Sequence, residues 1–227
     1  MKSYIKTHGK KAFVQLMKKS ALAGLFISIG AMFSMSVAKC GNLAQGVCFS
    51  VGLFCVLCCE ASLFTGYIPS IQSVWNGKLT YKTLFIRLAL IWTFNLVGAF
   101  ILALMALQIH TDASIVATTK ASMPCHELFI KSILCNVMVC FAAWSYKTNR
   151  HKNTHIVDAV VSCILPVACF VACGFEHSIA DMFYMSLGMM QGTVSPIGFA
   201  YVIGVATIGN VVGGVAFSWL TYDGGDS

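Results

Sequence analysis

The chain has 227 residues, of which 58% are hydrophobic and only 10% are charged, whereas a soluble domain has about 25% charged residues. This composition excludes an ordinary soluble globular protein and predicts an all-α integral membrane protein. The formal net charge of +7 does not call for a nucleic-acid partner, because Lys and Arg concentrated on one side of a membrane are a signal of topology.

Six apolar stretches are long enough to cross a lipid bilayer, which takes about 20 residues. They are residues 20–38, 46–75, 84–107, 127–145, 154–187 and 198–219. The first stretch is about twice as long as the apolar core of a signal peptide and has no small-residue cleavage pattern before Lys39, so we predict a transmembrane helix. The expected organisation is an N-terminal tail at 1–19, one transmembrane domain at 20–219 and a C-terminal tail at 220–227.

The distribution of Lys and Arg predicts the orientation of the chain. With both termini on the same side, twelve of the fifteen Lys and Arg residues fall on that side, and only Lys39, Lys120 and Lys131 fall on the other. Under the positive-inside rule this distribution predicts a multi-pass protein of the cytoplasmic membrane with both termini in the cytoplasm.

The third and sixth stretches share a sequence pattern. FNLVGAF at 94–100 and GNVVGGVAF at 209–217 each contain an Asn followed three residues later by a Gly. Small residues at this spacing let helices approach closely, which by itself could explain the pattern. The pattern also predicts that residues 20–107 are repeated as residues 127–219. A second copy of three spans would enter the membrane upside down, as in many transport proteins.

The second and fifth stretches are too long for single spans, and each is interrupted. In SLFTGYIPS, Gly66 and Pro69 can end one helix and begin another. In CGFEHSIADM, Gly174 precedes a group of titratable residues. Interrupted helices in matching positions point to a site near the middle of the membrane, and two helix N-termini facing such a site would favour a small anion.

Glu176, His177 and Asp181 are the titratable residues at the second interruption. An unperturbed pKa of about 6.5 makes His177 the group that can exchange a proton near neutral pH; the alternative is a neutral histidine that bridges helices. Glu176 is expected either to organise the broken backbone or to tune His177, and Asp181 to have a structural role near the outer surface. Thr65, at the other interruption, is expected to offer its hydroxyl to His177.

The eleven cysteines include Cys55, Cys58 and Cys59 in the motif CVLCC. A Cys-x-x-Cys on a transmembrane helix lacks the usual context of a redox motif, and buried Cys behaves as a small hydrophobic residue. We therefore expect these thiols to be inert and predict no metal site and no cofactor. Cys40 and Cys125 lie near the outer surface, and the sequence leaves open whether they pair.

Four segments resemble the formate/nitrite transporter family, which also includes hydrosulfide channels. They are LFTG in the second stretch, KASMPCHELFIKSILCNVMVCFAAW leading through the fourth, GFEHSIADMF in the fifth and GNVVGGVAF in the sixth. The resemblance covers residues 20–219 in order. It implies a six-helix, aquaporin-like protomer that assembles as a homopentamer with one pore per protomer. It also implies a channel or transporter, not an enzyme, for formate or, alternatively, for nitrite or hydrosulfide.

The resemblance implies roles for individual residues as well. His177 would be the central histidine, Thr65 its hydrogen-bond partner, Glu176 a supporting group and Lys120 the lysine of the outer vestibule. The remaining pore residues would be Phe49, Phe170 and Asn136 at an outer constriction, Leu53, Leu63 and Val139 at an inner constriction, and Asn210 along the pore.

One position departs from the family pattern. Many members have an acidic residue directly before LFTG, where this chain has Ser62. Glu60 lies two residues earlier and would point about 200° away on a helix, so we do not expect it to substitute.

These features predict a mechanism. An unpaired anion loses much hydration free energy in an apolar constriction, whereas a neutral acid does not. We therefore expect Lys120 to attract the anion, and a proton supplied by His177 or drawn through it from water to accompany the anion across. Two other classes remain: a membrane thiol enzyme that uses the cysteines, and a pore for neutral solutes. The second is disfavoured because the sequence has no paired Asn-Pro-Ala loops.

Overall fold

The computed structural model describes residues 9–151 and 156–224. Its helices in chain order are α2 (Lys10–Ser36), η1 (Ala38–Cys40), α3 (Asn42–Cys58), α4 (Phe64–Tyr67), η2 (Ile68–Ser70), α5 (Ile71–Trp75), α6 (Tyr81–Gln108), α7 (Ser114–Ala121), α8 (Cys125–His151), α9 (Ile156–Ala172), α10 (Ser178–Met190) and α11 (Pro196–Leu220). Parts of both predicted tails, and the expected start of the fifth stretch at Thr154, lie outside the described residues.

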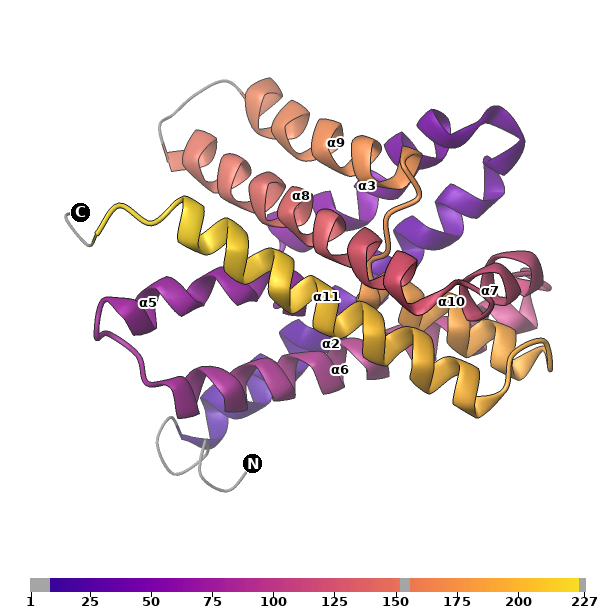
Figure 1. The fold of residues 1–227 in the computed structure, drawn as a ribbon, viewed down its shortest axis with the longest axis horizontal. Coiled ribbons are helices and arrows are strands. Elements are labelled where there is room, and N and C mark those ends of the chain that lie inside the picture. The colour runs from indigo at the N-terminus through magenta and orange to yellow at the C-terminus, as the bar shows by residue number, and fades with distance from the viewer. Residues whose placement is uncertain (1–8, 152–155, 225–227) are drawn as a thin grey trace.

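Among the described residues, four helices are long and apolar enough to cross a membrane: α2, α6, α8 and α11. Helices α3 and α9 are apolar but shorter. Helix α2 begins at Lys10, well before the apolar stretch predicted from residue 20, because a helix can continue past the surface of the bilayer. Helix α7 had not been expected, and it lies at the opposite end of the molecule from α5 (Figure 1).

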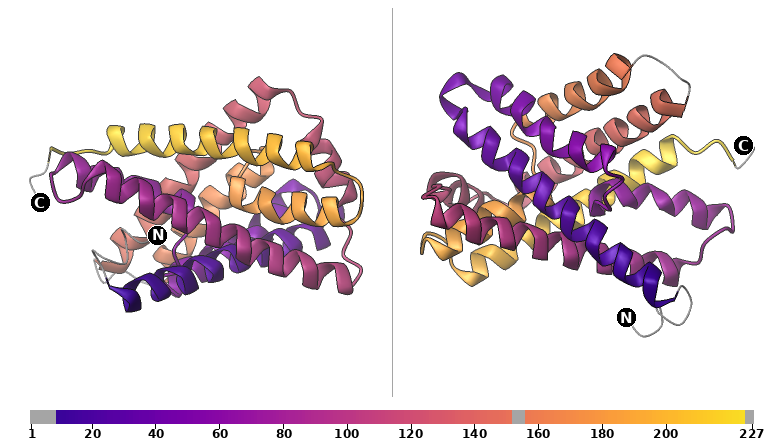
Figure 2. Two further views of the ribbon diagram at one scale, coloured as in Figure 1. Left: turned by 90° about the horizontal axis from the view of Figure 1, so that it is seen from below. Right: turned by 180° about the vertical axis from the view of Figure 1, so that it is seen from behind.

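The long helices pack in pairs. Helix α2 packs along α6 and α8 packs along α11, while α3 and α9 pack against each other and against α2 and α8. The views in Figure 2 show α2 beside α6 from two further directions. Helix α10 is enclosed by this arrangement, since it contacts α6, α11, α2 and α7.

The first interruption lies earlier than the sequence predicted. The chain leaves helical geometry after Cys58 and resumes it at Phe64, so Gly66 and Pro69 lie inside the following helical segment and do not form the break. Glu60 makes the turn with a φ of 49°, in a region that residues other than glycine seldom occupy. Pro69 fits near the start of η2, because the N–H groups of a first turn have no partner within the helix.

The second interruption matches the prediction for Gly174. Helix α9 ends at Ala172 and α10 begins at Ser178. Gly174 has a φ of 66°, a conformation that costs glycine little. Glu60 and Gly174 thus both have a positive φ, in the left-handed region, where the chain turns at the two interruptions.

The side chain of Asn95, on α6, holds the first interruption in place. Its amide nitrogen donates to the carbonyl oxygens of Ser20 at 2.7 Å and Ser62 at 2.9 Å. Its amide oxygen accepts from the backbone N–H of Phe64 at 2.9 Å. One buried side chain therefore satisfies two backbone groups that the interruption would leave unpaired, at Ser62 and Phe64, and ties them to α2 through Ser20.

Asn210, on α11, holds the second interruption in the same way. Its amide nitrogen donates to the carbonyl oxygens of Ser132 at 2.7 Å and Glu176 at 3.0 Å. Its amide oxygen accepts from the backbone N–H of Ser178 at 2.9 Å. The two hydrogen-bond patterns place Leu63 and His177 at matching positions, each next to the residue whose N–H the asparagine accepts.

Gly98 and Gly213, one turn after these asparagines, allow the close packing of the helix pairs. A Cβ at Gly98 would lie 2.0 Å from the carbonyl oxygen of Ala21, and a Cβ at Gly213 would lie 2.2 Å from that of Ile133. Both distances are far below contact distance, so a larger residue would force the helices apart.

We expect Gly98→Ala to lower the free energy of unfolding by about 1–3 kcal/mol, as overpacked cores do. Thermal unfolding in detergent, followed by tryptophan fluorescence, measures the change. The matched control is Gly204→Ala on α11, where a Cβ would meet nothing within 4 Å. An equal loss of stability in both variants would contradict this account of Gly98.

Candidate functional site

Two cavities approach the interruptions from opposite ends. The first has a volume of about 150 Å³ and is called here the Lys120 pocket; it is lined by Ser34, Met35, Gln45, Phe49, Val116, Lys120, Phe170, Val171, Gly174, Phe175, Glu176, His177, Ala180, Asp181 and Tyr184. The second has a volume of about 490 Å³ and is called the Lys147 pocket; it is lined by Leu53, Val56, Leu57, Glu60, Ala61, Ser62, Leu63, Gly66, Tyr67, Ala143, Tyr146 and Lys147.

His177 and Thr65 meet between the two interruptions, as the sequence predicted. The Nε2 atom of His177 lies 2.9 Å from the hydroxyl oxygen of Thr65, and both side chains are buried. Thr65 and His177 lie 112 positions apart in the chain. Thr65 is at the start of α4 and His177 directly precedes α10. The fold thus brings both interruptions to one point.

The other ring nitrogen of His177 caps α10. Nδ1 accepts a hydrogen bond from the backbone N–H of Ala180 at 3.3 Å. A nitrogen that accepts in this way carries no proton, so the ring proton of neutral His177 lies on Nε2 and is donated to Thr65. A second proton on Nδ1 would remove the helix cap. His177, rather than Glu176, is therefore the capping residue.

Two phenylalanine rings enclose the imidazole on the side of the Lys120 pocket. The ring centroids of Phe49 and Phe170 lie 6.4 Å and 6.0 Å from that of His177, and 5.7 Å from each other with the planes at 79°. Phe49 is 3% and Phe170 2% exposed. These rings leave an apolar surround at the inner end of the Lys120 pocket.

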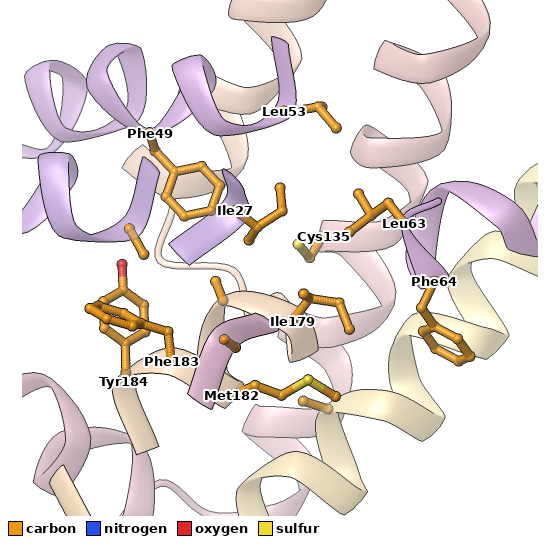
Figure 3. Packing of buried hydrophobic residues seen from close by; sticks show 14 of the residues in the cluster. Ile27, Phe49, Leu53, Leu63, Phe64, Cys135, Ile179, Met182, Phe183 and Tyr184 are labelled. Carbon is orange, nitrogen blue, oxygen red and sulfur yellow. The ribbon is translucent and has the colours of Figure 1, made fainter. Parts of the chain in front are cut away.

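Leucines take the corresponding place on the side of the Lys147 pocket. Leu53 and Leu63 line that pocket, and Figure 3 shows Leu53 on α3, near Phe49 on the same helix, with Leu63 just ahead of Phe64. Val139 is buried but lines neither cavity.

Asn136 and Asn210 also line neither cavity, and the amide nitrogen of each donates to backbone carbonyl groups. Asn136 donates to the carbonyl oxygen of Asn210 at 2.6 Å and lies 3.5 Å from that of Thr65. Both residues hold the polypeptide around the interruptions. The assignment of Asn136 to a constriction with Phe49 stays a prediction.

Lys120 forms a buried ionic cluster with Glu176 and Asp181. Its Nζ atom contacts a carboxylate oxygen of Glu176 and lies 2.9 Å from one of Asp181; it also lies 5.4 Å from the centre of the Tyr184 ring. Its place in the sequence predicts Asp181 near the surface, but the side chain is fully buried because α7 covers this side of α10. No signal in the sequence pairs Asp181 with Lys120, since the contact depends on the position of α7.

The cysteines in the described part of the chain form no disulfide. All eleven are free thiols, including Cys40 and Cys125. Cys58 contacts the hydroxyl of Tyr146 at 3.5 Å. Within residues 9–151 and 156–224 there is no group of three or more His, Cys, Asp or Glu side chains that could hold a metal ion.

Comparison with known proteins shows which family the chain belongs to. The sequence profile described as "Formate/nitrite transporter" matches residues 1–223. The chain belongs to the formate/nitrite transporter family. It is thus a multi-pass membrane protein of a family of transporters rather than enzymes.

Two relatives by sequence and one solved structure illustrate the similarity. The formate channel FocA of Escherichia coli K12 is 30% identical over 88% of this chain and 82% of its own length. The nitrite transporter NirC of Salmonella typhimurium is also 30% identical, over 89% of this chain and 80% of its own. A solved structure titled "Pentameric formate channel with formate bound" has a TM-score of 0.78 and 27% identity, covering 94% of this chain and 97% of its own.

Proposed function

We propose that the chain conducts small monovalent anions of weak acids across the cytoplasmic membrane, formate first among them, and that a proton accompanies each anion through the apolar centre. The observation that carries this proposal is the position of His177, enclosed by two phenylalanine rings and hydrogen-bonded to Thr65. The similarity to a formate channel and to a structure with formate bound supports formate as the substrate.

In this proposal the Lys120 pocket is the outer vestibule and the Lys147 pocket is the inner one. Phe49 and Phe170 form the outer constriction, and Leu53 and Leu63, with Val139 behind them, form the inner one. The anion enters the Lys120 pocket and then has to cross rings that offer it no hydrogen bonds. Because losing hydration costs an ion far more than a neutral molecule, formate crosses this part as formic acid.

The proton reaches formate from His177 or through it from water. The hydrogen bond from Nε2 to Thr65 leaves the threonine hydroxyl free to donate to the permeant, so imidazole and hydroxyl form a short chain of donors. His177 takes up a proton from water as it gives one, so the ring is neutral before and after the step, and formic acid returns the proton to water on the far side. No other proton source is required.

The architecture we propose has six membrane spans in two inverted repeats, with both termini in the cytoplasm. The matching hydrogen bonds of Asn95 and Asn210 support the repeat, and the uneven distribution of Lys and Arg supports the orientation. A homopentamer is supported by the pentameric neighbour. Large apolar side chains exposed on the long helices are available for subunit and lipid contacts.

Formate flux into proteoliposomes tests the mechanism. We expect flux to rise as the pH falls from 8 to 5, because more formate then carries a proton. We expect His177→Asn to lower the flux by a factor of about 100 or more, the range in which a positioned proton-transfer group contributes. His126→Asn, at an exposed histidine on α8, is the matched control and should transport normally. Flux that is independent of pH and indifferent to His177→Asn would overturn the mechanism.

Nitrite or hydrosulfide is the alternative substrate, since each is a small anion of a weak acid. The similarity to NirC equals that to FocA in identity, so it favours neither. A side-by-side measurement of formate, nitrite and hydrosulfide flux in the same vesicles decides among them. Swelling with an uncharged solute such as glycerol would instead indicate a neutral-solute pore.

A further inference from the structure

The ionic cluster of the Lys120 pocket contains one positive and two negative side chains. Lys120 is in contact with both Glu176 and Asp181, so the three ionised side chains sum to −1. Their side chains are 13%, 5% and 1% exposed respectively. A buried net charge is unfavourable, because the protein interior does not supply the hydrogen bonds and the polarity of the water that the charged groups have lost.

Asp181 is the member whose charge is least compensated. Neither of its carboxylate oxygens accepts a hydrogen bond of proper geometry from a described residue, although the carboxylate is buried and borders the pocket. It also lies close enough to Glu176 for the two carboxylates to repel each other. Two carboxylates that share a site do not both ionise readily.

Among the described residues, no further lysine or arginine forms an ion pair with this cluster. Lys131 on α8, whose carbonyl accepts from the N–H of Glu176, pairs with Glu127 instead. Tyr184 on α10, His177 at the interruption and Cys135 on α8 are the other titratable groups that face it. The Lys and Arg residues of α2 and α6 all lie in the first halves of those helices, away from the pocket, and α11 has none. Lys120 therefore balances the two carboxylates alone.

We propose that Lys120, Glu176 and Asp181 together form a proton-binding site whose occupancy sets the charge of the Lys120 pocket. With one proton shared by the two carboxylates the cluster is neutral. When that proton leaves to water the cluster carries −1. The proton comes from and returns to water on the side of the Lys120 pocket, and no bond other than O–H changes.

For transport the inference rests on the proposed function. A neutral cluster leaves the pocket open to an anion, whereas a cluster of charge −1 repels it. Asp181→Asn removes one carboxylate and leaves Lys120 paired with Glu176, so this cluster stays neutral between about pH 5 and pH 8. Asp181 thus gives the channel a dependence on pH that is additional to the protonation of the permeant.

Infrared spectroscopy of the purified protein tests the proton without any transport. The wild type at pH 7 should show a carboxylic-acid carbonyl band that shifts in D₂O and disappears at high pH. Asp181→Asn and Glu176→Gln should each abolish the band, because one carboxylate beside Lys120 needs no proton. Asp112→Asn, at an exposed carboxylate whose pKa is lowered by hydrogen bonds from Ser114, should retain it.

Flux measurements test the consequence. The ratio of formate flux in Asp181→Asn to that in the wild type cancels the protonation of formate itself. We expect a ratio near one at pH 5 and on the order of tenfold at pH 8, the effect of one unit charge roughly 12 Å from the permeant at an effective dielectric constant of about 20. The control Asp112→Asn should give a ratio near one at both pH values.

The two measurements separate the possible failures. A wild type without a carboxylic-acid band, or a band that survives in Asp181→Asn, would overturn the proton site. A flux ratio that is the same at every pH would overturn its effect on the pocket. A wild type that does not move formate would overturn the proposed function, while the infrared result would still decide the proton site; if Asp181→Asn does not fold, the wild-type spectrum and Glu176→Gln decide it.

Discussion

Replacing Lys120 with methionine is expected to destabilise the protein by about 3–5 kcal/mol, the usual result of removing one partner from a buried ionic cluster. Methionine keeps most of the length of the side chain but leaves Glu176 and Asp181 buried without a cation. The loss should shrink as the pH falls, because the carboxylates can then take up protons and become neutral. Thermal unfolding in detergent at pH 5 and pH 8 measures both the loss and its dependence on pH.

Two further variants make this expectation specific to the cluster. Lys39→Met removes an exposed lysine and should leave the unfolding temperature unchanged. Lys120→Met combined with Asp181→Asn leaves a single carboxylate and should recover part of the stability. A Lys120→Met protein as stable as the wild type at pH 8 would show that the cluster does not hold α7 against the interruption.

Replacing Asn210 with alanine is expected to cost about 2–6 kcal/mol, because it leaves two buried backbone groups at the interruption unpaired at about 1–3 kcal/mol each. These groups are the carbonyl of Glu176 and the N–H of Ser178, and the third hydrogen bond goes to Ser132 in the unbroken helix α8. Since the two groups flank His177, formate flux in the surviving protein should fall by more than the loss of folded protein explains. Flux normalised to the amount of folded protein measures this second effect.

The same change at other asparagines provides the comparison. Asn95→Ala also removes three hydrogen bonds to backbone groups, so it should cost a similar amount of stability. Asn76→Ala, at an exposed position, should cost little. If Asn95→Ala and Asn210→Ala were no more destabilising than Asn76→Ala, the asparagines would not be what holds the interruptions.

The two interruptions show how far local sequence patterns reach. Gly174 was a reliable signal, because its positive φ is a conformation that glycine adopts at little cost. At the other interruption the strongest local signals, Gly66 and Pro69, were misleading, and the turn falls on Glu60. Its position depends on hydrogen bonds from Asn95 on α6, and a contact between helices leaves no local pattern in the sequence.

The candidate site was predictable in part for the same reason. The pairing of Thr65 with His177 followed from the expected symmetry of two interruptions. The burial of Asp181 did not, because it depends on α7 (Ser114–Ala121), a short helix without a clear apolar periodicity. Spacing along the chain suggested a residue near the surface, whereas its surroundings are determined by a segment some 60 positions earlier.

The matching positions of Leu63 and His177 have a consequence for how such a pore can change. Each position is held by an asparagine that hydrogen-bonds backbone groups beside it. The side chain of Leu63 adds no cap to the helix that follows it, whereas the ring of His177 also caps α10. We therefore expect the leucine side of the pathway to accept other side chains at little cost to the fold, while any replacement of His177 has to supply a new acceptor for the N–H of Ala180.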